Sequence, residues 1–296
     1  MADLRTSRKY WTGGGNKYLE EIENSSDVPC DGKAPSHAPQ FMRELRSITF
    51  PEFKKLVDSY DREFTDSMFA GDAYIIRGVV NPDSLRKLKA DLHAWGQNCP
   101  PSFHKVQDGV PNFHRIITDD LVKKYALKYP RHDYYFFRHN ADPFGVWPMI
   151  NEFWSYTKKW GGFAPDECIQ NVPSDGLVDR IVVAHYPAGI GYIERHQDPW
   201  GHQRTIMSIQ MTQRGEDFQS GGLYFIDREG REITSEGITK IGDAVINYPT
   251  VAHGVHRIDE NAPRPDWNSI NGRWFFGLYT METDCLVHAR HTGKPA

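Results

Sequence analysis

The second half of this chain is a series of short β-rich runs, and the series constrains the fold more than any other feature. After Val178, apolar and β-branched residues cluster in the segments 179–189, 204–212, 221–227, 238–248 and 273–280. Glycine, proline and aspartate lie between the segments, as they do at turns. Short strands at this spacing predict a β-sandwich or a β-barrel.

The first half has a different pattern, with helices as well as strands. Segments 72–80 and 133–140 are apolar enough to predict strands, and segments 81–95 and 146–160 predict amphipathic helices. Asn81 is suited to be the N-cap of the first helix, because Pro82 follows it at the first helical turn. The expected fold class is therefore α+β and mainly β. We expect a double-stranded β-helix (a jelly roll of the cupin-like type) with helices packed on one sheet.

The chain divides unevenly. Residues 1–45 are polar and contain the segments "TGGG", "NSSD" and "DGKAPSHAP", which predict an N-terminal extension. Residues 46–296 are expected to form one domain, with a helical part over 46–177 and the jelly-roll core over 178–282.

Composition excludes several classes of protein. The net charge of the 296 residues is −4 and no long basic run occurs, which argues against nucleic-acid and membrane partners. The four cysteines form no CxxC pair, so neither a disulfide framework nor a zinc ribbon is expected. The N-terminus has no apolar signal region and no segment is long enough to span a membrane, so we expect a cytoplasmic protein.

One His-x-Asp triplet lies between two of the predicted strands. His196 and Asp198 follow the segment 179–189 and precede the segment 204–212, so both side chains are expected near a strand end. The segment "NYPTVAHGVHRI" offers a third ligand, either His253 or His256, and we favour His253. Two imidazoles and one carboxylate are the ligand set of non-haem iron(II) oxygenases, and they leave coordination positions free for a co-substrate and for dioxygen.

A cation is expected near these ligands. Arg273 begins the last predicted strand, after the candidate histidines. A guanidinium can hold a carboxylate through two parallel hydrogen bonds, so Arg273 is a candidate for binding the co-substrate.

These motifs, taken in order, resemble those of the iron(II)- and 2-oxoglutarate-dependent dioxygenases, in particular the branch that contains oxygen-sensing prolyl hydroxylases. The resemblance covers residues 178–282 and rests on the segments "HYPAGIGYIERHQDP", "SGGLYFID", "IGDAVINYPTVAHGVHRI" and "NGRWFFGLYT". It implies that His196, Asp198 and His253 bind Fe(II), that Arg273 binds 2-oxoglutarate and that Tyr186 lines the co-substrate pocket. Met211 stands where prolyl enzymes of this branch have a tyrosine that contacts 2-oxoglutarate.

The resemblance implies an enzyme that uses Fe(II), 2-oxoglutarate and dioxygen. Because Asp198 occupies the position that halogenases of the family replace with a small residue, hydroxylation is the expected reaction. We expect the substrate to be a small molecule, such as an amino acid or a biosynthetic intermediate. Two alternatives stay open: a hydroxylase of proteins or peptides, and an inactive cupin-like binding protein.

Overall fold

Two β-sheets form the body of the molecule in a computed structural model, which describes residues 38–122, 128–198, 200, 202 and 205–286. The large sheet has eight strands in the order β1 (Leu45–Thr49), β2 (Ala73–Arg77), β10 (Ala244–Asn247), β7 (Ile206–Gln210), β12 (Gly272–Glu282), β5 (Leu177–Pro187), β4 (Arg131–Phe137) and β3 (Phe113–Ile117). The small sheet has four strands in the order β6 (Ile193–His196), β11 (His253–His256), β8 (Gly222–Ile226) and β9 (Glu232–Thr234).

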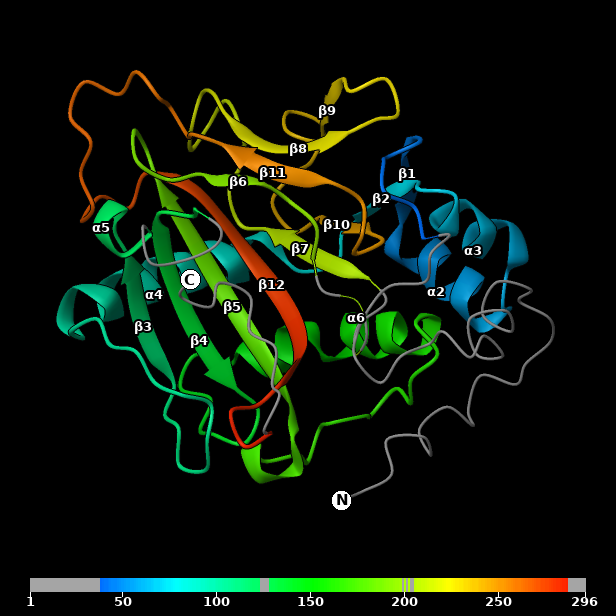
Figure 1. The fold of residues 1–296 in the computed structure, drawn as a ribbon, viewed down its shortest axis with the longest axis horizontal. Helices are drawn as coiled ribbons and strands as arrows, with labels where there is room; N and C mark the ends of the chain where they lie inside the picture. The colour runs from blue at the N-terminus through cyan, green and yellow to red at the C-terminus, as the bar shows by residue number, and fades with distance from the viewer. Residues whose placement is uncertain (1–37, 123–127, 199, 201, 203–204, 287–296) are drawn as a thin grey trace.

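The chain crosses repeatedly between the two sheets from β5 onward. Strands β5, β7, β10 and β12 lie next to one another in the large sheet, whereas β6, β8, β9 and β11 form the small one (Figure 1). Eight antiparallel strands arranged in this way form a double-sheet jelly roll. The expected fold class, α+β and mainly β with a jelly-roll core, is confirmed.

Helices cover the outer face of the large sheet, as the sequence predicted. They are α2 (Phe50–Asp58), α3 (Arg62–Phe69), α4 (Pro82–Asn98) and α6 (Val146–Trp160), with the shorter α5 (Asp119–Val122) and the 3-10 helix η2 (Pro173–Asp175) elsewhere. Asn81 caps α4 by accepting hydrogen bonds from the backbone of Asp83 and Ser84. The apolar faces of α2, α3, α4 and α6 join the large sheet in one buried cluster. No helix of the described residues is long and apolar enough to cross a membrane.

The first half contributes more to the sheet than the sequence indicated. Strands β1 to β4 extend the large sheet at both edges, so the segment expected to be mainly helical also supplies half of its strands. The predicted strand 72–80 ends at Arg77, because Gly78 turns the backbone with a φ of 71°. The strands β1, β3, β6, β9 and β11 were not predicted. Residues 1–37 of the expected extension lie outside the described residues, and the division at residue 45 stays a prediction.

A second apolar cluster fills part of the space between the two sheets. Tyr135, Val182 and Phe275 contribute to it from the large sheet, and Ile193 and Val255 from the small sheet. Since alternate residues of a strand point to opposite faces, this cluster identifies which side chains point into the roll. The candidate metal ligands His196 and His253 belong to strands of the small sheet, and Asp198 follows one of these strands.

Candidate metal centre

The structure brings His196, Asp198 and His253 together. His196 ends β6 and His253 begins β11, and the two residues are partners in the antiparallel register of these strands. The backbone N–H of Asp198 donates to the carbonyl of Pro249, which holds the turn after β6 beside the start of β11. One ligand atom from each of the three residues lies within 4.8 Å of the others, with 3.2 Å between His253 Nε2 and Asp198 Oδ2 and 3.8 Å between His196 Nε2 and Asp198 Oδ1.

Backbone carbonyls orient both imidazoles. His196 Nδ1 lies 2.8 Å from the carbonyl oxygen of Glu194, and His253 Nδ1 lies 2.9 Å from that of Val251. Because a carbonyl only accepts, each Nδ1 carries a hydrogen and each Nε2 is turned toward Asp198, where it would bind a metal ion. This is the arrangement by which histidines that bind metal ions are fixed in proteins. The donor set therefore fits a divalent cation such as Fe(II).

The charges of the three side chains agree with such a role. Burial, and after it the neighbouring His253, lowers the pKa of His196 to about 4, so His196 is neutral at pH 7. Burial alone would raise the pKa of Asp198, but the hydrogen bond from His253 and the charges of His253, His196 and Arg131 together outweigh it, and the pKa is lowered. Burial would lower the pKa of His253, but the hydrogen bond to Asp198, the charge of Asp198 and the hydrogen bond to the Val251 carbonyl together raise it. The site thus combines an ionised carboxylate with an imidazole lone pair.

The second candidate histidine lies apart from this cluster. His256 has a half-exposed side chain, its Nε2 lies 2.7 Å from a carboxylate oxygen of Glu232, and its ring stacks on Tyr224. His253 and His256 are three positions apart on one strand, so they point to opposite faces of the small sheet. Only His253 of the two is in the group of potential ligands among the described residues.

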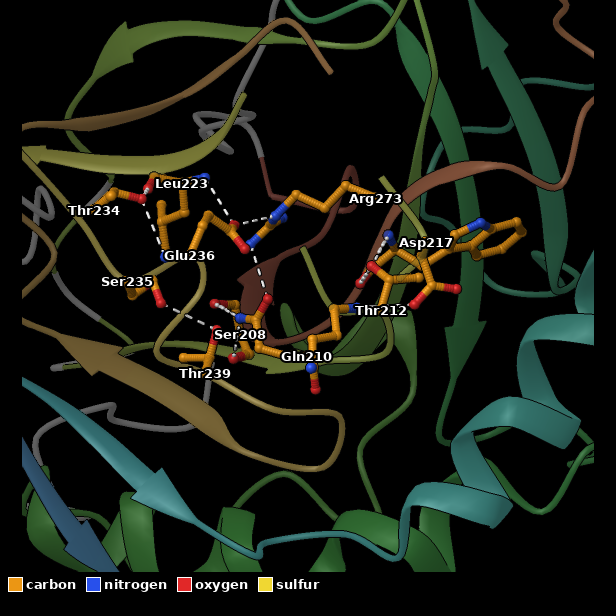
Figure 2. A network of polar contacts seen from close by, with 12 residues as sticks. Ser208, Gln210, Thr212, Asp217, Leu223, Thr234, Ser235, Glu236, Thr239 and Arg273 are labelled. Carbon is orange, nitrogen blue, oxygen red and sulfur yellow. Dashed lines mark hydrogen bonds and ion pairs between the residues drawn. The ribbon is translucent and has the colours of Figure 1, made fainter. Parts of the chain in front are cut away.

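Arg273 is buried on the inner face of the roll. Its side chain is 2% exposed, Nε donates to Glu236 Oε1 at 2.6 Å, and Nη2 donates to Gln210 Oε1 at 3.1 Å, as Figure 2 shows. Among the described residues, Nη1 has no hydrogen-bond partner. Glu236 and Gln210 therefore fix one side of the guanidinium and leave donors of the other side for a carboxylate.

The sequence did not reveal Glu236 or Gln210 as neighbours of Arg273. Gln210, rather than the adjacent Met211, points toward Arg273, since Met211 packs in the cluster beneath the helices. The sequence gives no signal for Glu236, whose packing against Gly222 appears only in the structure, where a Cβ on Gly222 would lie 2.4 Å from the Cγ atom of Glu236.

Tyr186 lies beside Arg273, where a residue that lines the co-substrate pocket is expected. The two residues are register partners of β5 and β12, and the Arg273 guanidinium carbon lies 6.0 Å from the centre of the Tyr186 ring. The Tyr186 hydroxyl accepts a hydrogen bond of 2.7 Å from Arg131 Nη1, and Arg131 Nε in turn donates to Asp133 at 2.7 Å. Arg131 and Asp133 were not among the predicted site residues.

Comparisons with known proteins returned solved structures only. No protein-family model matches the sequence, and no curated protein matches it either.

Three of the similar structures come from different organisms. A full-length Neurospora crassa protein in complex with alpha-KG and thymine is 11% identical, with 90% of this chain and 96% of that chain covered and a TM-score of 0.47. A prolyl hydroxylase from Trichoplax adhaerens, in complex with a hypoxia inducible factor peptide, is 10% identical, with 78% and 91% covered and a TM-score of 0.47. A 2OG-Fe(II) oxygenase family protein from Caulobacter crescentus is 12% identical, with 79% and 85% covered and a TM-score of 0.46. At such low identities, the functional argument depends on the residues of this chain and their geometry.

Proposed function

We propose that this protein is an Fe(II)- and 2-oxoglutarate-dependent oxygenase that hydroxylates a small molecule. The observation that carries the proposal is the convergence of His196, Asp198 and His253, with both imidazoles held in the tautomer that a metal ion needs. The jelly-roll fold and the buried Arg273 support it. The cytosol is the proposed location, in agreement with the free thiols of Cys99, Cys168 and Cys285.

In this proposal each residue has a defined task. His196, Asp198 and His253 hold Fe(II), and Arg273 binds the distal carboxylate of 2-oxoglutarate through the donors that Glu236 and Gln210 leave available. When bound, the metal ion supplies the activation of dioxygen that the oxidation requires. The two sheets exclude water from the reacting groups, and the lowered pKa of Asp198 keeps its carboxylate ionised.

A spectroscopic titration tests this function without knowledge of the substrate. Under anaerobic conditions, Fe(II) and 2-oxoglutarate together should give the wild-type protein a visible charge-transfer absorption. His253→Ala should abolish the absorption because it removes a ligand, whereas His256→Ala should retain it because that side chain lies on the opposite face. Absence of the absorption in the wild-type protein at saturating concentrations would refute the proposal.

A further inference from the structure

The inner face of the large sheet contains three arginines on its central strands. Arg131 of β4, Arg180 of β5 and Arg273 of β12 alternate with residues that pack beneath the helices, so their side chains point into the roll. Two of the three have a carboxylate partner, at 2.7 Å between Arg131 and Asp133 and at 2.6 Å between Arg273 and Glu236. Their charges are thereby balanced within the protein.

Arg180 differs from the other two. Its guanidinium lies between two aromatic rings, with 5.1 Å from its central carbon to the centre of the Tyr135 ring and 5.5 Å to that of Tyr279. Its Nε is buried without a hydrogen-bond partner, and no carboxylate of the described residues forms an ion pair with it. A buried donor of a charged group is costly unless a partner satisfies it, so the arrangement favours an anion supplied from outside the chain.

Tyr279 adds a second donor at the same place. Arg180 and Tyr279 are register partners of β5 and β12, and the Tyr279 hydroxyl has no hydrogen-bond partner among the described residues. The only carboxylate that this face of β4 carries, that of Asp133, already accepts from Arg131 and from the Tyr135 hydroxyl. A guanidinium and a phenol thus remain for one ligand.

This pair lies toward the other end of the sheet from the co-substrate arginine. Tyr186, the register partner of that arginine, is six residues from Arg180 along β5, which corresponds to about 20 Å. The candidate ligand Asp198 interacts electrostatically with residues at both ends: its charge adds to the effect of burial in raising the pKa of Tyr279, and the charge of Arg131, beside Tyr186, helps to lower the pKa of Asp198. A molecule held at Arg180 would therefore be close to the metal centre and separate from a 2-oxoglutarate held at Arg273.

We propose that Arg180, with the hydroxyl of Tyr279, binds a carboxylate of the substrate, which is accordingly a small organic acid or free amino acid. The inference rests on the proposed function and specifies its substrate class. A carboxylate satisfies the guanidinium through two parallel hydrogen bonds and balances its charge. An internal residue of a peptide has no main-chain carboxylate to offer, so the site favours a small acid.

Paired substrates test the proposal with the unchanged protein. Free amino acids and organic acids would be screened for succinate release with Fe(II), 2-oxoglutarate and dioxygen, each beside its own carboxamide. We expect at least one acid to release succinate, and its carboxamide to have a KM about 10- to 100-fold higher, since a hydrogen bond between charged groups is lost. Succinate release from carboxamides as good as that from the acids, or from peptides alone, would overturn the proposal.

Variants locate the effect at Arg180. Arg180→Gln should raise the KM for the acid by about 10- to 100-fold and leave the KM for the carboxamide unchanged, whereas Arg180→Lys, which keeps the charge, should give an intermediate value. Arg86→Gln is the control, because Arg86 is exposed and its ion pair, with Asp83, lies on helix α4, away from the inner face of the sheet. Equal KM values for the acid in wild type and in both Arg180 variants would contradict the assignment.

The anaerobic absorption separates the two proposals. Arg180→Gln should keep the Fe(II) and 2-oxoglutarate absorption of the wild type, because Arg180 belongs to neither ligand set. If the wild type has the absorption but the acids fail as substrates, the substrate class is wrong and the oxygenase proposal stands. If the wild type lacks the absorption, the proposed function itself is wrong.

Discussion

At the scale of single residues, one buried ion pair determines how Arg273 presents its guanidinium. Glu236 Oε1 accepts from Arg273 Nε at 2.6 Å and from the backbone N–H of Leu223 at 2.9 Å. Arg273 belongs to the large sheet and Leu223 to the small sheet, so Glu236 connects the two walls of the roll. Both charged side chains are 2% exposed, which makes the loss of either partner costly.

Replacement of Glu236 should therefore affect stability strongly. We expect Glu236→Ala to reduce the free energy of unfolding by about 3–5 kcal/mol, because a buried arginine loses its counter-charge. Glu236→Gln keeps an acceptor oxygen and should cost about 1–3 kcal/mol. Urea unfolding of the metal-free protein measures both values. Glu229→Ala, at an exposed site, is the control and should unfold like the wild type, while an equally stable Glu236→Ala would contradict the role of the pair.

At the scale of elements, strands within apolar segments were predictable and strands within more polar segments were not. Strands β5, β7, β8, β10 and β12 lie in the segments that the sequence predicted. Strands β6 and β11 have four residues each, and two of the three candidate ligands are on them. Four residues are too few for the alternation of apolar and polar side chains to identify a strand. The pairing of His196 with His253 is also a contact between distant parts of the chain, which a local pattern does not reveal. The motifs were sufficient to select the candidate ligands that the structure brings together, whereas Glu236, the partner of Arg273, depends on packing.

The turn into β8 gives a prediction at this scale. Gly222 has a φ of 107°, and a Cβ there would approach Glu236 Cγ to 2.4 Å. Gly222→Ala should therefore destabilise the protein by about 2–4 kcal/mol, through backbone strain and displacement of Glu236.

A matched glycine serves as the control for this experiment. Gly230 also has a positive φ, of 78°, but no atom lies within 4 Å of the Cβ position. Gly230→Ala should lower the free energy of unfolding, measured with urea, by only about 1–2 kcal/mol, because backbone strain is its sole effect. Equal losses for the two variants would show that the Glu236 contact does not matter.

At the scale of the whole molecule, the first half of the chain extends the large sheet and buries a row of histidines. His114 of β3, His132 of β4 and His185 of β5 lie on the outer face, which the helices cover. His114 Nε2 and His132 Nδ1 are 2.9 Å apart, and the rings of His132 and His185 are 5.4 Å apart. The sequence shows these histidines as isolated residues, and only the pairing of three strands makes them neighbours.

This row should make the stability of the metal-free protein depend on pH. Burial, and after it the neighbouring His114, lowers the pKa of His132 to about 4 from an ordinary value of 6.5. Between these values the unfolded chain binds a proton that the folded chain does not, so stability falls as the pH decreases from 6.5 to 4, by about 3 kcal/mol for this residue. His132→Gln should remove this part of the pH dependence of urea unfolding, while His256→Gln, at a half-exposed site, should follow the wild type. If wild type and His132→Gln lose stability in parallel over this range, His132 does not contribute to the pH dependence of unfolding, and the prediction is wrong.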